Sequence, residues 1–330
     1  MARGAEELYL GIDLGGTKIA VSLWSGASGK GSCRKLGRAY WETLPGGPEP
    51  NLRRMLEEGS GLLAAAARKK GGKAGLKAVG VSGGGPLDPW TGTILSIPNL
   101  PGWSNVPISR ILSEHWKVPA YLENDANACA VAEWLHGAGK GTRHLSFLTC
   151  STGIGAGLIL DGRLFRGSRF LAGEVGHQVI VPGGLACGCG NLGCLEAYAS
   201  GAGMARRLEA FREKDSSLPV TAREVVERAK EGDKFSVRFL RETADYLAMG
   251  LSNLVFLLNP ERIVLGTIPT SAGDLFFTPL RESLSRRLWP SLLQGLEVVP
   301  SALWPDLGDH AALAVARDIF GSAPRARVPK

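Results

Sequence analysis

The sequence lacks an apolar run that approaches the ~18–20 residues needed to cross a bilayer, so no membrane-spanning helix is expected. Near the start of the chain, Glu6 and Glu7 occupy the place where a secretory signal peptide would carry its apolar stretch. Cysteine is scarce, with 6 among 330 residues, which is too few for a scaffold built on disulfides. These absences lead us to expect a cytoplasmic globular protein.

Proline contributes only 19 residues, whereas glycine contributes 45, about twice its usual share. The glycines have no Gly-X-Y period, which excludes a collagen-like chain, and a hydrophobic content of 44% excludes a disordered tail. A length of 330 residues predicts about two domains with ample surface to bury. The glycines also cluster, and the clusters are where we expect the functional groups. They lie at Gly11–Gly16, Gly80–Gly85, Gly153–Gly157 and Gly183–Gly193.

Charge is mixed, with 38 basic and 31 acidic residues and a formal net charge of +7. The densest basic groups are Arg68–Lys70 with Lys73, and Arg325, Arg327 and Lys330 near the C-terminus. A basic surface can attract nucleic acid or a phosphorylated small molecule. Because the basic residues are scattered, we favour a solvated surface and predict neither a nucleic-acid partner nor a membrane partner.

The pattern of strands and helices predicts an α/β protein with two related halves. Residues 8–23 form a strand, a glycine turn and a second strand, and residues 145–160 repeat that layout. Helices alternate with short apolar strands along the rest of the chain, as in α/β proteins. They include a long helix over Lys234–Leu258 and a helix over Thr221–Glu231, for which Thr221 and Glu224 are expected to form a capping box. We expect the helix over 52–70 to be interrupted near Gly59–Gly61, and a helix over 278–289 to begin with Thr278 as its cap and Pro279 at its first position.

The first glycine turn is Asp13-Leu14-Gly15-Gly16-Thr17-Lys18. Glycine allows backbone amides to approach a phosphate closely, and a carboxylate such as that of Asp13 suits Mg²⁺. The alternative is an ordinary hairpin with a capping aspartate. The spacing matches neither a P-loop nor a Rossmann fingerprint.

A second turn of this kind, Ser151-Thr152-Gly153-Ile154-Gly155-Ala156-Gly157, lies in the repeated unit. One glycine hairpin is weak support for phosphate binding. Two of them at equivalent places in a repeated layout predict a pair of phosphate-binding turns.

Three cysteines are clustered as Cys187-Gly188-Cys189 and Cys194, and His177 lies ten residues before the first of them. Three thiolates and one imidazole form a tetrahedral ligand set that zinc prefers in closed, structural sites. The alternative is a group of free thiols that cluster by chance. We predict a structural Zn²⁺ that orders this loop.

Glu123-Asn124-Asp125 stands at the end of a predicted strand and before a predicted helix. In α/β proteins such positions carry reactive groups, and an aspartate there can take a proton from an attacking hydroxyl. Asn124 can both donate to and accept from the hydroxyls of a polyol. The alternative is a helix N-cap, which both residue types favour.

Taken together, these segments resemble the ROK family of bacterial sugar kinases, within the superfamily that joins sugar kinases to actin. The resemblance runs from Gly11 to about Ala316, and its most specific parts are GIDLGGTK, LENDANACAVAE, GEVGH and CGCGNLGCLEAYAS. It implies two actin-like (ribonuclease H-like) α/β domains around a cleft. We place a small domain at 1–122 plus 308–330, and a large domain that carries the zinc loop at 123–307.

The resemblance also implies a role for individual residues. Asp125 would be the general base that takes a proton from the sugar hydroxyl. The sugar would be bound by Asn99, Asn124, Glu174, His177 and Glu196, near the backbone of Gly83 and Gly84. His177 would face the sugar with one ring nitrogen and ligate zinc with the other. The nucleotide would be bound by Asp13, Gly15, Gly16, Thr17, Lys18, Thr152, Gly153 and, at the adenosine, Gly266.

Two positions depart from the family pattern. Ser151 stands where the second turn usually begins with glycine, and Thr267 follows Gly266 where a second glycine is common. Thr267 adds a Cβ where backbone usually approaches the nucleotide, so these two residues bear on nucleotide affinity and on the choice of phosphoryl donor.

The resemblance implies transfer of the γ-phosphoryl group of ATP, with Mg²⁺, to the 6-hydroxyl of a hexose. Glucose is the first expectation; fructose, mannose, allose, N-acetylglucosamine and N-acetylmannosamine stay open. The alternatives are a sugar-responsive transcription regulator and a non-catalytic sugar-binding protein. The regulator is less expected, because only about seven residues precede the strand at Leu8, too few for a DNA-binding module. A homodimer, or a tetramer, is expected from the family.

Overall fold

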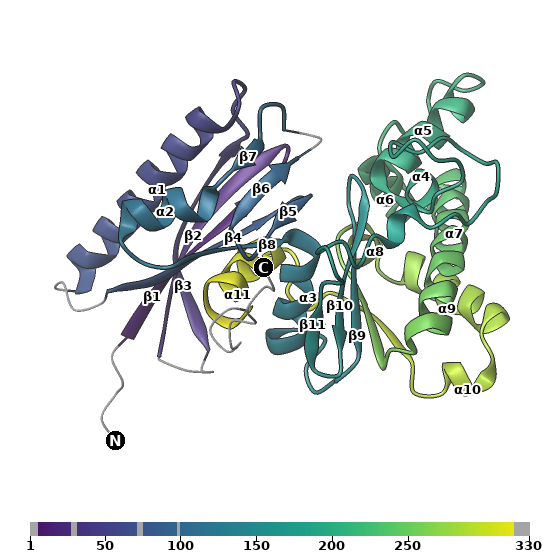
Figure 1. Ribbon diagram of the computed structural model, residues 1–330. Coiled ribbons are helices and arrows are strands. Elements are labelled where there is room, and N and C mark those ends of the chain that lie inside the picture. Colours follow the sequence, from purple (N-terminus) through teal and green to yellow (C-terminus); the bar gives the residue numbers. More distant parts are fainter. Residues whose placement is uncertain (1–5, 28–31, 71–74, 98–99, 320–330) are drawn as a thin grey trace. The chain divides into compact units, whose positions relative to one another are not determined.

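The computed structural model describes residues 6–27, 32–70, 75–97 and 100–319 (Figure 1). The chain divides into two compact units, which are Met1–Ala132 with Asp306–Lys330, and Glu133–Pro305. We refer to them as the first unit and the second unit, and each is built on a sheet of its own. None of the helices in the described ranges is long and apolar enough to cross a membrane.

The sheet of the first unit has the strand order β3-β2-β1-β4-β8, and a smaller sheet has the order β5-β6-β7. In chain order the strands are β1 (Glu6–Leu14), β2 (Lys18–Ala27), β3 (Cys33–Glu42), β4 (Leu76–Gly83), β5 (Leu87–Asp88), β6 (Thr93–Ser96), β7 (Ser104–Val106) and β8 (Ala120–Asn124). The helices are α1 (Pro48–Lys70), α2 (Ile108–Trp116), α3 (Asp125–His136), which runs on into the second unit, α11 (Leu307–Ala314) and the π-helical η2 (Val315–Ile319).

The sheet of the second unit has the order β11-β10-β9-β12-β13. Its strands are β9 (Leu145–Cys150), β10 (Ile154–Leu160), β11 (Arg163–Phe165), β12 (Arg262–Leu265) and β13 (Glu297–Pro300). Its helices are the 3-10 turn η1 (Val175–His177), α4 (Glu196–Ala199), α5 (Gly201–Arg212), α6 (Ala222–Lys230), α7 (Lys234–Leu258), α8 (Ile268–Ala272), α9 (Asp274–Arg287) and α10 (Pro290–Leu293).

The two sheets have the same topology, which confirms the predicted repeat and the α/β class. In the first unit β2 pairs antiparallel with β1 and β3, while β4 pairs parallel with β1 and β8. In the second unit β10 pairs antiparallel with β9 and β11, while β12 pairs parallel with β9 and β13. Each glycine turn therefore joins the central strand of its sheet to an antiparallel neighbour.

Helices cover both faces of the first sheet. On one face α1 and α2 bury the side chains of Leu10, Ile12 and Val81, and on the other α11 and η2 pack against it (Figure 1). A Cβ on Gly80 would lie 2.2 Å from the backbone nitrogen of Ala316, so a side chain there would push this helix away. Gly80, which belongs to one of the glycine clusters, thus permits helix packing.

Three sequence expectations about helices have clear outcomes. The long helix α7 occupies the predicted residues. Half of the predicted capping box of α6 forms, because Thr221 Oγ1 accepts from the Glu224 amide at 3.2 Å, whereas Glu224 Oε2 accepts at 2.9 Å from the Val220 amide instead of the Thr221 amide. The interruption near Gly59 is wrong: α1 is continuous, and Gly59 lies so close to Trp116 that a Cβ would be 2.7 Å from that ring.

The predicted start of the helix over 278–289 is also wrong. Helix α9 begins at Asp274, after Gly273, and Pro279 lies inside it instead of at its first position. Buried side chains of Phe276 and Phe277 precede the proline, and their packing in the core outweighs the local preference of proline for a helix start.

Candidate functional site

The first glycine turn connects β1 to β2 and is held from outside by one residue. The Gly15 amide closes the turn by donating to the Lys18 carbonyl at 3.0 Å. Thr43, which follows β3, donates its hydroxyl to the Gly15 carbonyl at 2.9 Å and its amide to the Thr17 carbonyl at 3.0 Å. The carbonyls of the turn are therefore occupied by Thr43.

The second glycine turn connects β9 to β10 and is closed by the Ser151 amide, which donates to the Gly153 carbonyl at 2.9 Å. The first amides of α5 hold it: Gly201 donates to the Ser151 carbonyl at 2.6 Å and Ala202 donates to the Thr152 carbonyl at 3.2 Å. The turn carbonyls are thus occupied here as well, by backbone amides.

Both turns leave two consecutive amides unused. Within the described residues, the amides of Gly16 and Thr17 in the first turn, and of Thr152 and Gly153 in the second, donate to no protein acceptor. Gly16, Thr17 and Thr152 are exposed, and Lys18 beside the first turn adds a positive charge on the surface. Adjacent free amides of this kind form a concave site that suits an anion such as phosphate.

Carboxylates gather next to the first turn. Burial is the main reason why the pKa of Asp13 is raised to about 6, and the negative charges of Asp125 and Asp309 raise it further. Asp309 is buried and pairs with Lys35 at 2.8 Å and with Arg38 at 2.9 Å. Asp13 and Asp125 therefore lie within reach of each other's charge at the sheet edge where β1 and β8 end.

Asp125 is the first residue of α3 and is exposed, although its Oδ1 accepts from the Ala126 amide at 2.8 Å. Asn124 Oδ1 accepts from the amides of Ala126 at 3.0 Å and Asn127 at 3.2 Å, which is helix capping. The capping alternative is thus correct for Asn124, and it holds the start of α3 in place. Buried Glu123 supports the same corner by accepting from the Asn124 amide at 3.0 Å.

Three further residues of the first unit are expected near the sugar: Gly83, Gly84 and Asn99. Gly83 ends β4 and pairs with Asn124 of β8, and Gly84 follows it. A Cβ on either glycine would meet other atoms only at ordinary contact distances, 3.6 Å and 3.8 Å, so packing does not require glycine there. Asn99 lies outside the described residues.

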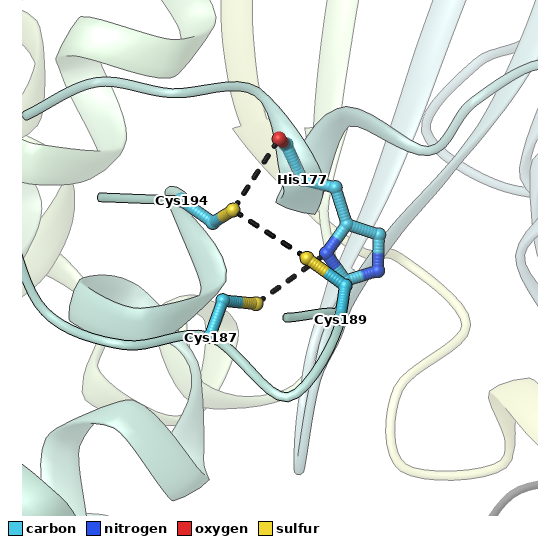
Figure 2. A group of neighbouring side chains, drawn as sticks. All are labelled: His177, Cys187, Cys189 and Cys194. Carbon is cyan, nitrogen blue, oxygen red and sulfur yellow. Dashed lines mark hydrogen bonds between the residues drawn. The ribbon is translucent and has the colours of Figure 1, made fainter. Parts of the chain in front are cut away.

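The four predicted metal ligands come together in the second unit (Figure 2). One ligand atom from each of His177, Cys187, Cys189 and Cys194 lies within 4.8 Å of all the others. A tetrahedral zinc site has bonds of about 2.3 Å to sulfur and about 2.0–2.1 Å to nitrogen. Two sulfur ligands of such a site are therefore about 3.8 Å apart, and a sulfur and a nitrogen ligand are about 3.6 Å apart.

The distances between ligand atoms in the structure agree with these expected values. Cys189 Sγ lies 3.8 Å from Cys194 Sγ, and Cys187 Sγ lies 3.6 Å from His177 Nδ1. The four residues can hold a zinc ion, with His177 Nδ1 as the fourth ligand atom. The other ring nitrogen, Nε2, lies 3.9 Å from a carboxylate oxygen of Glu174, so the imidazole has its two nitrogens toward different neighbours.

Glu196, expected at the sugar, lies directly after the metal ligands at the start of α4. Its Oε2 accepts from the Ile154 amide at 2.9 Å, immediately after the second glycine turn. A Cβ on Gly153 would lie 2.6 Å from this oxygen. Glu196 therefore contacts the turn, which its position in the sequence did not indicate.

The residues expected at the adenosine lie at the end of β12. The Gly266 amide donates to the Leu148 carbonyl at 2.8 Å. Thr267 has φ of +54°, a backbone conformation that a β-branched residue rarely adopts. Its hydroxyl accepts from the Cys150 amide at 3.1 Å and donates to the Cys150 carbonyl. Thr267 thus supports the end of β9, where the second turn begins.

Sequence reasoning missed Thr43, Asp309 and the contact from Glu196 to the turn. Thr43 and Asp309 are far from the turns in the chain, and neither belongs to a glycine cluster or to a motif. The repeated topology could have suggested that each turn needs an external hydrogen-bond partner, but it does not identify the residue.

Several known proteins are similar to this chain along nearly its whole length. The ROK family model matches residues 9–319. A glucokinase from Thermotoga maritima is 34% identical over 94% of this chain and 98% of its own. A xylose repressor from Caldicellulosiruptor bescii is 33% identical over 69% of this chain and 59% of its own.

Solved structures agree in fold. A ROK hexokinase from Thermus thermophilus has a TM-score of 0.74 and 37% identity, over 94% of this chain and 97% of that one. A ROK family glucokinase from Streptomyces griseus, in complex with glucose and AMPPNP, has a TM-score of 0.77 and 29% identity, over 94% and 99%.

The duplicated sheet topology and the pair of glycine turns define an actin-like α/β protein with two related halves. Within that class, the chain belongs to the ROK family.

Proposed function

We propose that this protein is an ATP-dependent hexose kinase that phosphorylates the 6-hydroxyl, with glucose as the first candidate substrate. The observation that carries the proposal is the pair of glycine turns, each with two adjacent amides that have no protein acceptor in the described residues. Phosphoryl transfer depends mainly on positioning and on groups that stabilise negative charge. The relatives named glucokinase and hexokinase support the same reading.

In this proposal the first unit supplies the acid–base group. Asp125 accepts the proton of the 6-hydroxyl as the sugar oxygen attacks the γ-phosphorus, and ADP departs with the electron pair of the broken bond. Asn124, which caps α3, fixes the backbone from which Asp125 projects. Mg²⁺, when bound, neutralises charge on the transferring group, and Asp13 is the carboxylate at the first turn suited to hold it, directly or through water.

The second unit supplies the sugar-binding side chains of Glu174, His177 and Glu196. A zinc ion bound to His177, Cys187, Cys189 and Cys194 fixes the orientation of the imidazole through Nδ1 and leaves Nε2 for a sugar hydroxyl. No coordination position remains open in such a set, so the metal orders the loop and takes no part in the transfer.

A panel of six sugars with ATP tests the proposal, with ADP release as the readout. The sugars are glucose, fructose, mannose, allose, N-acetylglucosamine and N-acetylmannosamine. We expect turnover with at least one hexose and the highest kcat/KM with glucose. No ADP release with any of the six would contradict a hexose kinase, and a higher kcat/KM with another sugar would replace glucose.

A sugar-responsive regulator is the second candidate, favoured by the 33% identity to a xylose repressor. The two candidates differ in what they bind. A gel-shift assay on genomic fragments, with and without sugar, should show no sequence-specific retardation for a kinase, whereas a specific shift that sugar alters would favour the regulator.

A further inference from the structure

One short segment of the second unit contacts both the candidate metal centre and the second glycine turn. The segment is 194–202: it begins with the ligand Cys194 and ends in the first turn of α5. At its far end Gly201 and Ala202 donate to the carbonyls of the turn at 2.6 Å and 3.2 Å. The position of the turn is therefore tied to the same stretch of backbone that carries Cys194.

Glu196, in the middle of this segment, adds a side-chain contact. Its Oε2 accepts from the Ile154 amide at 2.9 Å and stands where a side chain on Gly153 would be. Its other carboxylate oxygen, Oε1, accepts no hydrogen bond from the residues that the structure describes. The Glu196 residue is half-buried, so part of it is accessible to a ligand.

We infer that Glu196 is a positioning residue that makes sugar binding and nucleotide binding at the second turn interdependent. The inference rests on the proposed function, because it assigns the sugar to Oε1 and a phosphate to the turn. A sugar hydroxyl that donates to Oε1 restricts the carboxylate, and Oε2 then holds Ile154 and Gly153 in one arrangement. The nucleotide meets a turn that is already ordered and loses less conformational entropy on binding. By linkage, the nucleotide increases the affinity for sugar by the same factor.

Two substitutions break the contact from opposite sides. Glu196→Ala removes both oxygens, whereas Gly153→Ala keeps Glu196 and displaces its carboxylate with a methyl group. Glu196→Gln is the conservative variant, since its amide oxygen can still accept from Ile154. Gly61→Ala is the matched control, because a Cβ at Gly61 meets nothing within 4 Å.

The experiment measures the Kd of a non-hydrolysable ATP analogue with Mg²⁺ by calorimetry, with and without saturating sugar. In the wild type we expect sugar to tighten the analogue by about 5–150-fold. In Gly153→Ala we expect that factor to fall below about 2-fold, because the displaced carboxylate no longer links the sugar to the Ile154 amide. Glu196→Gln should retain part of the factor, and the double variant Glu196→Ala/Gly153→Ala should lose no more than either single variant.

Metal content and melting temperature of each variant show that it is folded. Retention of the wild-type factor in Gly153→Ala and in Glu196→Ala would overturn the inference while leaving the kinase proposal intact. A wild-type protein that binds neither the analogue nor any of the six sugars would instead overturn the proposed function, and the inference with it. If Glu196→Ala does not fold, Gly153→Ala alone decides the question.

Discussion

The two glycine turns of this protein occupy equivalent places in sheets of the same topology, yet they are held in different ways. The first turn depends on one residue, because Thr43 donates its hydroxyl to the Gly15 carbonyl and its backbone amide to the Thr17 carbonyl. The second depends on backbone amides of α5 and on the carboxylate of Glu196. Each turn nevertheless leaves two adjacent amides without a protein acceptor in the described residues, so the free amides match while the support around them differs.

The chemical surroundings of the turns differ as well. Carboxylates lie next to the first turn, where burial and then the charges of Asp125 and Asp309 raise the pKa of Asp13. The second turn is contacted by Glu196, which lies two residues after Cys194 of the Cys–His group. In the proposed function, acid–base chemistry and metal-dependent order therefore belong to separate units, so a substitution in one unit is expected to spare the other.

The largest effect is expected for Asp125, the proposed general base of the first unit. Asp125→Asn should lower kcat by about 10²–10⁴-fold because the carboxamide cannot accept the proton, and it should leave the sugar Kd within about 2-fold. Steady-state assays and calorimetry check both. Asp274→Asn is the matched control, since Asp274 is likewise the exposed first residue of a helix, α9. Near-normal turnover in Asp125→Asn would mean that another group is the base.

Loss of the metal centre should be the largest perturbation of the second unit. Cys194→Ser should reduce zinc from one to well below one per chain and lower the melting temperature by on the order of 10 °C, since structural zinc contributes directly to folding. Hydrogen exchange should show faster exchange at Ile154 and no change at Gly15. Cys129→Ser, outside the cluster, should keep the metal. Wild-type protein without zinc, by metal analysis, would contradict the site.

The raised pKa of Asp13 predicts that the stability of the protein depends on pH. Because the folded state raises the pKa of Asp13 from 3.8 to about 6, it binds this proton more tightly than the unfolded chain does. The stabilisation that the folded protein gains from protonated Asp13 is therefore fully present below about pH 4 and is lost as the pH rises to about 6. Asp13→Asn, always neutral, should melt higher than the wild type at pH 7, by on the order of 5 °C, and close to it at pH 4.

Asp125→Asn should shift the same profile in part, because it removes one of the negative charges that raise the pKa of Asp13. A constant difference between Asp13→Asn and the wild type from pH 4 to pH 7 would show that Asp13 ionises normally in the folded protein.

A smaller effect is expected for the support of the first turn. Thr43→Val keeps the shape of the side chain but removes the hydroxyl that donates to Gly15, at a cost of about 1 kcal/mol. The Kd for a nucleotide analogue should rise by about 5-fold, whereas Thr43→Ser should bind as the wild type does. Equal affinities for the valine and serine variants would mean that the hydroxyl does not support the turn.

The smallest difference concerns Thr267, which supports the start of the second turn through Cys150. Thr267→Ala and Thr267→Gly both lose the hydroxyl, but only glycine relieves the unfavourable φ of +54°. Denaturant unfolding should find the glycine variant more stable than the alanine variant by about 1 kcal/mol. An alanine variant of equal stability would show that the positive φ causes no strain.

Much of the fold could be predicted because its cues are local. Periodic apolar residues and caps located α7 and α6, and the strand–turn–strand pattern at 8–23 and 145–160 predicted the repeat. The ligand group of His177, Cys187, Cys189 and Cys194 was predictable because three of its members lie within eight residues. Where packing against distant side chains overrides a local preference, as at Gly59 and Pro279, the expectations failed.

What the sequence by itself determined was therefore the chemistry: which residues can bind phosphate, metal or a proton, since glycines, thiols and carboxylates carry those properties wherever they lie. Only the tertiary structure decided what holds these groups in place. Thr43 contacts Gly15, which is 28 positions away in the chain, and Glu196 contacts Ile154, which is 42 positions away. Asp309 acts on the pKa of Asp13 from 296 positions away. Hydrogen bonds and charges act through a few ångströms of space, and no local pattern records which distant residues the packed sheets bring together.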